Sequence, residues 1–473
     1  MLREFSMIDQ INFAKLSGDY NKLHIDEIAA RRFIFGKPAV HGIHLVLFAL
    51  DYWAKSHVQP FELVSLKVNF RKPLLVGQAV ELKYKEDGNR IILKLFRNDE
   101  LLTDINICFT CRKWVKQNIT GSVYQEYKSK RVTALDLESS LGEIDITLDP
   151  ELAHQLFPEL KRFMPELQIA ELLALTRLVG MECPGENSLF ADVAVDFKET
   201  VSGGGLDYRV LEFDRRFSKA MIGVQGPSIK GVVGAFLRPE PTQQLPFSEI
   251  KTMIRPGEFL NQSAFIVGGS RGLGEVVAKL LAAGGAKVLF TYYKGSRDAQ
   301  SLHEELGREG CKIESIFFDV NQSQHKDMSV ITSFSPTHFY YFATANISAG
   351  TKSFSQELFN DFCAFYVAGF SSTLNSVEQA SARLTHVFYP SSVFVADCPG
   401  NFAEYSAAKA AGEEQCAMHQ QRRKDLRFYA PRLPKMSTDQ TQSMYGQSTV
   451  ADAAPVMLRH LRVFANTAQG VVL

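Results

Sequence analysis

The sequence predicts an α+β unit followed by a doubly wound α/β unit in one chain. Residues 39–55 read AVHGIHLVLFALDYWAK, an apolar helix, and segments of alternating polarity follow it. The same order of helix and alternating segments recurs from residue 169. From residue 263 the chain instead alternates strand, glycine-rich turn and helix, which is typical of a parallel sheet covered on both faces.

Size and charge limit the possible functions. A chain of 473 residues is too long for one ordinary core, so about two to four domains are expected. Lys+Arg and Asp+Glu both number 52, which gives no basic excess, and we expect no nucleic-acid partner. No apolar run approaches a membrane span, and the start MLREFSMIDQ lacks an apolar signal core. We therefore expect no membrane association and a cytoplasmic location.

The seven cysteines favour reduced thiols. Their number is odd and they are scattered. Cys108 and Cys111 form a single C-x-x-C, but positions three apart on a strand point to opposite faces. We expect no metal site.

The first unit is predicted to be a sheet wrapped around one helix. Apolar residues over 8–17 have roughly helical spacing, and a second, strongly apolar helix begins near Gly42. A half-buried strand then places Val64, Leu66, Val68 and Phe70 on one face. Asp87-Gly88 marks a hairpin turn, and the strands that follow the first one cover residues 79–86, 90–97 and 101–112.

An internal duplication explains the next stretch of the chain. IAELLALTRLVGME is a second apolar helix, and the strand SLFADVAVDF follows it. Phe70 and Gly77 have the same spacing as Phe197 and Gly204, and each pair follows its strand. We expect domains over 1–125, 147–242 and 258–473, a polar connection over 115–146 and a linker over 239–258.

The stretch LSGDYNKLHID, residues 16–26, allows two interpretations. Asp19 or Asn21 could end one helix and Asp26 could begin the next. Alternatively, a carboxylate and an imidazole this close could be an acid/base pair that acts on water.

Three segments resemble the MaoC-like hot-dog fold of (R)-specific enoyl thioester hydratases. They are LSGDYNKLHID, AVHGIHL and VNFRKPLLVGQAVEL. The resemblance implies a double hot-dog in which Asp19 and His24 face a bound water near a thioester. Lys22 stands where the family usually has proline.

The chemistry of hydration agrees with these residue types. Water addition to a conjugated double bond needs a base for water and a proton for the α-carbon, and a carboxylate and an imidazole can share this work. The Gly42 N–H, at a helix N-terminus, is suited to an enolate-like oxygen. Asn21 is expected to orient the turn or Asp19, while His41 and His44 receive no catalytic role. The second copy lacks the Asp/His pair, so we expect it to complete the acyl pocket, with RLVGMECPGENS shaping the site.

The C-terminal unit carries a nucleotide-binding pattern. VGGSRGLGE places Gly268, Gly272 and Gly274 between a strand and a helix, where backbone N–H groups can hold a pyrophosphate. Tyr405-x-x-x-Lys409 follows, with Ser392 thirteen residues before Tyr405. Lys409 lies one helical turn from Tyr405, so its charge is expected to lower the phenol pKa.

This order and spacing resemble the short-chain dehydrogenase/reductase family, and 3-oxoacyl thioester reductases within it. The resemblance covers residues 258–473 and implies a Rossmann-type fold. It also implies that Tyr405 gives a proton to a ketone oxygen and that Ser392 hydrogen-bonds this oxygen. The charge of Lys409 is expected to favour loss of the Tyr405 proton. The cofactor-binding residues that it implies are Gly268, Ser270, Arg271, Gly272, Leu273, Gly274, Tyr292, Lys294, Asp319, Val320, Ala343 and Lys409.

The charge near the expected ribose site favours NADP(H). An NAD enzyme usually has an acidic residue about 20 residues beyond the glycine turn, and Tyr292 stands near that place. Arg271 and Lys294 could hold a 2′-phosphate. The sequence departs from the family at Ala343–Asn346, which replaces Asn-Asn-Ala-Gly, and at Tyr366, which stands where a relay asparagine is usual.

The two resemblances imply chemistries that share an intermediate, the 3-hydroxyacyl thioester. We expect a bifunctional dehydratase and NADP-dependent ketoreductase that acts on acyl-CoA or acyl-carrier-protein thioesters and forms a homo-oligomer. One alternative is a single live site, with the reductase acting on a sugar or polyketide carbonyl. Another is a non-catalytic protein that binds acyl thioesters or scaffolds partners.

Overall fold

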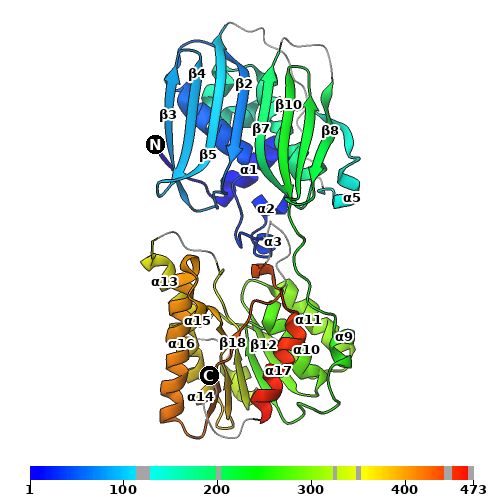
Figure 1. The fold of residues 1–473 in the computed structure, drawn as a ribbon, viewed down its shortest axis with the longest axis vertical. Helices are drawn as coiled ribbons and strands as arrows, with labels where there is room; N and C mark the ends of the chain where they lie inside the picture. Colours follow the sequence, from blue (N-terminus) through cyan, green and yellow to red (C-terminus); the bar gives the residue numbers. More distant parts are fainter. Residues whose placement is uncertain (113–127, 199–203, 323–327, 348–352, 442–449, 467–473) are drawn as a thin grey trace. The chain divides into compact units, whose positions relative to one another are not determined.

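The computed structural model divides into two compact units, Met1–Glu240 and Pro241–Gln442, with Ser448–Leu473 added to the second. The structure describes residues 1–112, 128–198, 204–322, 328–347, 353–441 and 450–466. Figure 1 labels the elements, and each unit is described by itself below. Among the described residues no helix has the length and apolar character needed to cross a membrane.

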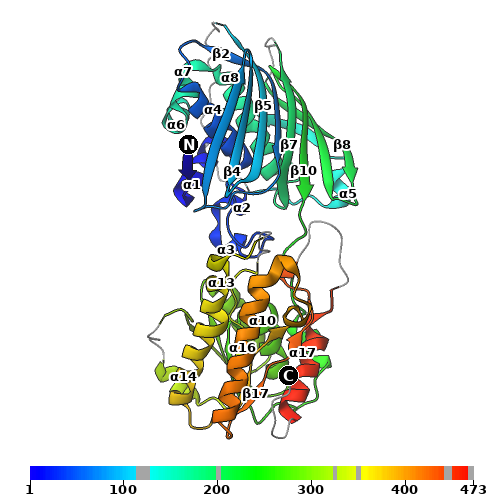
Figure 2. The same ribbon diagram turned by 60° about the vertical axis from the view of Figure 1, so that its left-hand side comes forward.

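The first unit is one antiparallel sheet of ten strands, with helices on one face (Figures 1 and 2). In sheet order the strands are β1 (Leu2–Glu4), β3 (Ala79–Asp87), β4 (Arg90–Arg97), β5 (Glu100–Cys111), β2 (Phe61–Phe70), β7 (Ser188–Phe197), β10 (Ile229–Leu237), β9 (Lys219–Gln225), β8 (Gly205–Asp214) and β6 (Leu141–Asp145).

The strand order confirms the double hot-dog. On one side it runs β3-β4-β5-β2 and on the other β7-β10-β9-β8, so each copy has the same connectivity. The copies meet where β2 pairs with β7, over Ser65–Asn69 and Asp192–Asp196. One sheet therefore spans both halves of the unit.

Two apolar helices fill the hollow of this sheet. They are α4 (Gly42–Ala54) and α8 (Glu166–Arg177), and both are buried along most of their length. The other helices are α1 (Met7–Ser17), α2 (Lys22–Ile25), α3 (Glu27–Ala30), α5 (Ala134–Leu137), α6 (Pro150–Leu156) and α7 (Pro158–Phe163), and α8 continues as a π-helical turn over Leu178–Glu182.

Two expectations for the first unit need correction. Val64 was expected on the buried face, but a bulge between Leu63 and Ser65 leaves it 43% exposed. The connection over 115–146 contributes strand β6 to the sheet edge, where it pairs with β8. Residues 113–127, which include part of that connection, lie outside the described residues, as does 199–203 within the second Phe–Gly spacing.

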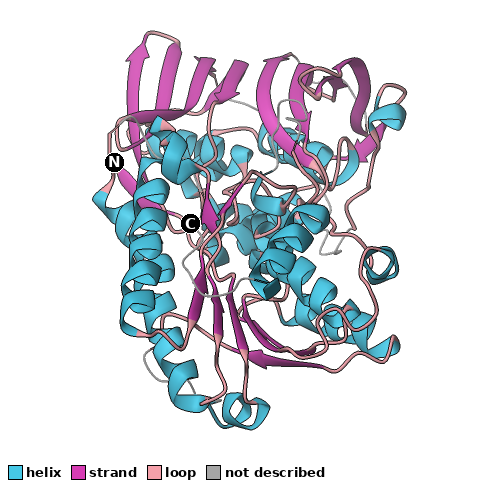
Figure 3. Ribbon diagram, turned by 60° about the horizontal axis from the view of Figure 1, so that its bottom comes forward, coloured by secondary structure: helices cyan, strands magenta, loops and turns pink. Residues whose placement is uncertain are grey.

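The second unit has a parallel six-stranded sheet between two layers of helices (Figures 1 and 3). In sheet order the strands are β13 (Ile313–Phe317), β12 (Lys287–Tyr292), β11 (Ser263–Val267), β14 (His338–Tyr341), β15 (His386–Phe388) and β17 (Arg427–Tyr429). In chain order this is 3-2-1-4-5-6, the Rossmann order, which confirms the predicted class. A short pair is formed by β16 (Ser391–Ser392) and β18 (Arg432–Leu433).

Helices on each face of this sheet bury a separate apolar cluster. One face carries α9 (Phe247–Thr252), α10 (Gly272–Ala283), α11 (Ser296–Arg308) and α17 (Ala453–Asn466), and the other α12 (Met328–Phe334), α13 (Gln356–Cys363), α14 (Phe370–Ala380) and α16 (Ala403–Arg422). A π-helical segment, Ala364–Gly369, joins α13 to α14, and α15 (Phe394–Asp397) precedes α16.

The linker expected over 239–258 is partly structured. Its α9 buries Phe247 and Ile250 in the cluster around α10, so this part of the segment belongs to the second unit. The apolar side chains in an otherwise polar, proline-containing stretch explain the difference.

Two candidate active sites

A glycine turn brings Asp19 into the interior of the first unit. Helix α1 begins with a capping box between Ser6 and Asp9 and ends at Gly18, whose φ of 76° is left-handed. The chain then turns sharply, and Asp19 is only 1% exposed. The capping roles fall to its neighbours, since Asn21 caps α2 and Asp26 caps α3. Asp19 caps neither helix.

The second hot-dog copy supplies the surroundings of the Asp19 carboxylate. Its Oδ2 accepts a hydrogen bond of 2.7 Å from the Thr176 hydroxyl on α8, and its Oδ1 accepts one of 3.2 Å from the Asn21 backbone N–H. Gly180, in the π-helical turn, leaves room for this group, because a Cβ there would lie 2.1 Å from Oδ1. Burial raises the pKa of Asp19 to about 6, although both hydrogen bonds act to lower it.

Asn21 ties the turn to the segment RLVGMECPGENS. Its Oδ1 accepts from the Leu23 N–H at 3.0 Å. Its Nδ2 donates to the carbonyl oxygens of Gly180, Gly185 and Glu186 at 3.0, 3.1 and 3.3 Å. Asn21 therefore holds the turn against this segment of the second copy.

His24 comes from the short helix α2 and is neutral. Its Nδ1 lies 2.7 Å from the Ala39 carbonyl oxygen, which can only accept, so Nδ1 carries the proton. Burial lowers the pKa of His24 to about 4. Nε2 of the neutral ring therefore holds a lone pair that can receive a proton.

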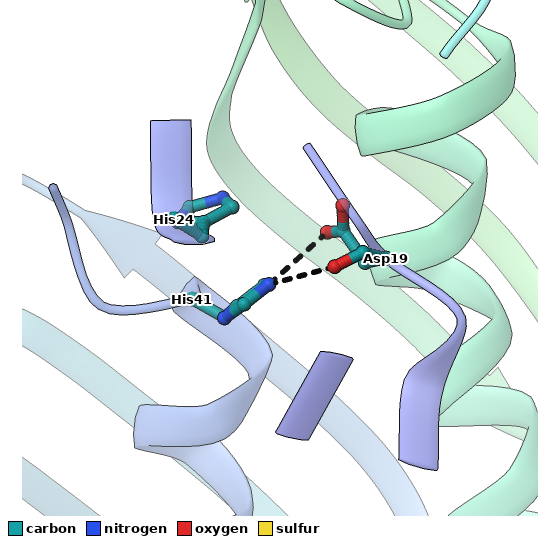
Figure 4. A group of neighbouring side chains, drawn as sticks. All are labelled: Asp19, His24 and His41. Atoms are coloured by element: carbon teal, nitrogen blue, oxygen red, sulfur yellow. Dashed lines mark hydrogen bonds and ion pairs between the residues drawn. The ribbon is translucent and has the colours of Figure 1, made fainter. Parts of the chain in front are cut away.

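His41 is the site residue that the sequence analysis missed. It precedes α4, is fully buried, and lies between His24 and Asp19 (Figure 4). Its ring stacks on that of His24 with centroids 3.9 Å apart. Its Nε2 lies 3.0 Å from the Asp19 backbone oxygen and 4.0 Å from Oδ2. His41 thus links the two residues that the sequence selected.

The three side chains bring one potential metal-ligand atom each within 4.8 Å of one another. Their hydrogen bonds favour proton transfer instead of metal binding. Nε2 of His41 faces a carbonyl oxygen, and a nitrogen that donates a proton to a carbonyl has no lone pair for a metal ion.

Gly42 is the first residue of α4, at the positive end of its helix dipole. A Cβ at this position would lie 2.9 Å from the Phe70 ring, so a larger residue would have to displace that ring. His44, two residues further along α4, stacks on Phe13 with ring centroids 4.5 Å apart. Burial lowers the pKa of His44 to about 3, in keeping with a packing role.

The glycine turn of the second unit has the backbone that close approach to a ligand requires. Gly268 and Gly272 have φ values of 76° and 59°, which favour glycine. A Cβ at Gly274 would lie 2.2 Å from the Gly268 oxygen, so a side chain there would push α10 away from the turn. Ser270 is buried and Leu273 is half-buried beside the N-terminus of α10.

The remaining predicted cofactor residues gather at one edge of the sheet. Tyr292 ends β12, and Lys294 follows it, exposed. Asp319 and Val320 follow β13, and Ala343 follows β14. Because carboxyl ends of parallel strands share an edge, these residues lie on the side of the sheet where the glycine turn begins.

Ser392, Tyr405 and Lys409 are brought together by β16 and α16. The Ser392 hydroxyl is close enough to the Tyr405 phenol to act on its pKa. Lys409 donates to the Pro390 carbonyl at 2.7 Å, and its Nζ lies 3.9 Å from the Tyr366 ring centroid and 5.0 Å from that of Tyr389.

The expected lowering of the Tyr405 pKa is not found. Burial raises it to about 12, and the Ser392 hydroxyl opposes this. Burial also lowers the pKa of Lys409 to about 7. Nζ of Lys409 packs over the rings of Tyr366 and Tyr389, and the Lys409 charge does not act on the pKa of Tyr405.

Tyr366, at the place of the usual relay asparagine, lies in the π-helical segment 364–369. Its hydroxyl hydrogen-bonds the Thr344 hydroxyl at 2.6 Å, within the stretch that replaces Asn-Asn-Ala-Gly. π-Helical turns are frequent at functional sites, and here one borders each of the two candidate sites.

Two family models match the chain. The model of the MaoC like domain matches residues 3–99, and that of the short chain dehydrogenase matches residues 262–444. Both sequence-based resemblances are thereby confirmed.

Individual relatives match the chain in part. A 3-hydroxyacyl-[acyl-carrier-protein] dehydratase, mitochondrial, of Arabidopsis thaliana is 30% identical over 113 residues, which cover 22% of this chain and 68% of that protein. Peroxisomal multifunctional enzyme type 2 of Mus musculus is 36% identical over 95 residues, 19% of this chain and only 13% of that protein. Short-chain dehydrogenase/reductase FrzI of Cladobotryum sp is 44% identical over 57 residues, 12% of this chain and 22% of that protein.

Proposed function

Because the chain belongs to the MaoC-like dehydratases through its N-terminal part and to the short-chain dehydrogenases through its C-terminal part, we propose that it is a bifunctional enzyme. It interconverts 3-oxoacyl, (R)-3-hydroxyacyl and trans-2-enoyl thioesters of CoA or acyl-carrier protein. The observation that carries this proposal is the closeness of the buried Asp19 and the half-buried His24, on the same chain as a Ser–Tyr–Lys group. The two chemistries meet at the 3-hydroxyacyl thioester.

The protonation of the first site suggests how water is added. With pKa values of about 6 and about 4, Asp19 is a carboxylate and His24 a neutral imidazole above neutral pH. Neither group then holds a spare proton. Water loses one proton to this pair, its oxygen bonds to the β-carbon, and the same proton is delivered to the α-carbon, so that atoms and charge balance.

The start of α4 is the proposed site of the thioester oxygen. This oxygen gains negative charge as the double bond is attacked, and the Gly42 N–H at the helix N-terminus can stabilise it. The apolar residues of α4 and α8 supply a bed for an acyl chain. The (R) configuration of the product is inferred from the family resemblance.

The second site fits a nicotinamide dinucleotide. A Cβ at Gly274 would fill the space between the turn and α10, and the N-terminus of α10 attracts a pyrophosphate. When bound, this cofactor supplies or accepts a hydride. Tyr405 then gives its proton to the carbonyl oxygen, and Ser392 hydrogen-bonds the same oxygen. Lys409 of this group is held in place by its hydrogen bond to the Pro390 carbonyl.

NADP is the proposed form of the cofactor. Tyr292, at the end of β12, offers no carboxylate to a ribose hydroxyl. Arg271 and Lys294 can bind a 2′-phosphate, and Arg271 lies 4.0 Å from Asp439 Oδ2, which holds it near the turn.

Two assays on the same preparation test the function. Hydration of crotonyl-CoA and NADPH oxidation with acetoacetyl-CoA are both expected. If only one activity is found, only one of the two sites is active on thioesters. If that activity is hydration, the reductase is expected to act on a sugar or polyketide carbonyl. Thioester binding without either activity supports the acyl-binding or scaffold alternative. The cytoplasmic location and the homo-oligomer also stay predictions.

A further inference from the structure

The two ring nitrogens of His41 each face an oxygen atom. Nδ1 lies 2.9 Å from Oε1 of Gln10 on α1, and Nε2 lies 3.0 Å from the backbone oxygen of Asp19. A neutral imidazole has one N–H and one bare nitrogen, so it can donate to only one of these oxygens. The identity of each oxygen therefore decides the charge of the ring.

The oxygen of Gln10 is fixed by the backbone. The same Oε1 accepts a hydrogen bond of 3.1 Å from the backbone N–H of His41, which can only donate. Exchange of the amide oxygen and nitrogen would place the NH₂ group against this N–H, with two donors facing one another. The atom is therefore an oxygen, and Nδ1 must carry a proton to bond it.

The oxygen that faces Nε2 of His41 is the peptide carbonyl oxygen of Asp19, which can only accept a hydrogen bond. Nε2 must also carry a proton to make its contact with the Asp19 backbone. Two protonated nitrogens make an imidazolium ion. The nearest carboxylate, that of Asp19, places Oδ2 4.0 Å from Nε2.

We propose that His41 is a buried imidazolium that positions Asp19 and keeps its side chain in the carboxylate form. It binds the turn through the Asp19 carbonyl and balances the charge of the carboxylate. His41 is thus a positioning residue, and its effect on hydration rests on the proposed function. The inference that His41 is charged does not depend on that function.

Charged and titratable groups surround His41 and the residues that it contacts. Burial and the neighbouring rings of His24 and His44 lower the pKa of His41, and the Asp19 carbonyl raises it. Arg177 on α8 acts on Asp19, and Arg238, after β10, acts on His24. Asp9 of α1 acts on His44. Both nitrogens of His41 face hydrogen-bond acceptors. We therefore infer that these acceptors and the Asp19 carboxylate stabilise the charged ring by more than its burial costs.

The charge of His41 can be read directly by NMR of the full chain with ¹⁵N-labelled histidine. At pH 8 both ring nitrogens of His41 are expected to be protonated. Their two ¹⁵N signals are assigned by variants, because His41→Gln removes them and Gln10→Glu shifts them. The second variant keeps the assignment possible if the first does not fold. A bare, unprotonated nitrogen in the His41 ring would overturn the proposal.

The effect on Asp19 is measured with ¹³C-labelled aspartate carboxyl groups. In His41→Gln, the Asp19 signal is expected to titrate about one pH unit or more above its value in the unsubstituted protein. His154→Gln, on the exposed face of α6, is the control and leaves the titration unchanged. An unmoved Asp19 titration would overturn the positioning role. Neither measurement needs hydration activity, so a failure of the proposed function remains distinguishable.

Discussion

Gly180 and Asp19, from different halves of the first unit, fit so closely that a Cβ on Gly180 would lie 2.1 Å from Oδ1 of Asp19. The backbone of the second copy is therefore one wall of the carboxylate site, although that copy carries no acid/base pair.

Gly180→Ala is expected to displace the Asp19 carboxylate and to lower the hydration rate about 100-fold, the scale of a misplacement of about 1 Å. Hydration of crotonyl-CoA measures it. Gly307→Ala is the control, because a Cβ there meets open space on α11. An unchanged rate in a folded Gly180→Ala protein would separate Asp19 from hydration.

Asp19→Asn and His24→Gln are each expected to lower hydration of a trans-2-enoyl thioester by about 100-fold or more, with melting temperatures nearly unchanged. The double variant should be little worse than either, since both act on one water. Asp26→Ala is the matched control. It removes the cap of α3, which costs about 1 kcal/mol, and leaves the rate alone. Wild-type rates in folded Asp19→Asn would mark the motif as structural.

Thr176→Val is expected to move the pH dependence of hydration. Asp19 acts as a carboxylate, so the rate falls as the pH drops below its pKa of about 6. The Thr176 hydroxyl lowers this pKa, and its removal raises it, which shifts the fall in rate to higher pH. Thr176→Ser keeps the hydroxyl and should keep the profile. A uniform loss of rate at all pH values would contradict the electrostatic explanation.

Tyr405→Phe is expected to abolish ketone reduction, since the phenol supplies the proton to the carbonyl oxygen. The loss should appear in kcat, with NADPH binding and enoyl hydration largely intact. Stopped assays with acetoacetyl-CoA and crotonyl-CoA on one preparation compare the two sites. A parallel fall in hydration would mean that the sites are not independent.

NADPH is expected to bind with clearly higher affinity than NADH, because Arg271 and Lys294 offer positive charge to a 2′-phosphate. Fluorescence or calorimetric titration measures both affinities. Lys294→Ala should weaken NADPH binding and leave NADH binding nearly unchanged, since Lys294 is exposed beyond β12. Equal affinities in the unsubstituted protein would remove the basis of the cofactor assignment.

Local patterns in the sequence were enough for most of the fold. Alternation fixes which face of a strand is buried, and strand β7 has the limits that its pattern predicts, Ser188–Phe197. The pattern failed at Val64 because a bulge shifts the register without changing composition. It also failed at the linker, where Phe247 and Ile250 pack on a helix that lies later in the chain.

The candidate site was only half visible in the sequence. Asp19, Asn21 and His24 lie within six positions, so one turn brings them close together. Thr176 and Gly180 are about 160 positions away and carry no motif, and a glycine in an apolar helix was their only signal. His41 received no catalytic role, because neither its hydrogen bonds nor its stacking on His24 follow from spacing.

The pairing of β2 with β7 also governs how the first unit can assemble. Both strands belong to one chain, so the central edge-to-edge contact forms at a rate that does not depend on protein concentration. A fragment that ends after β5 would instead present the β2 edge to solvent, with its N–H and C=O groups unpaired. Such a fragment would be prone to associate with other chains. Separating the two copies at the level of the gene would therefore replace an internal strand pairing with an exposed edge strand that can pair with another molecule.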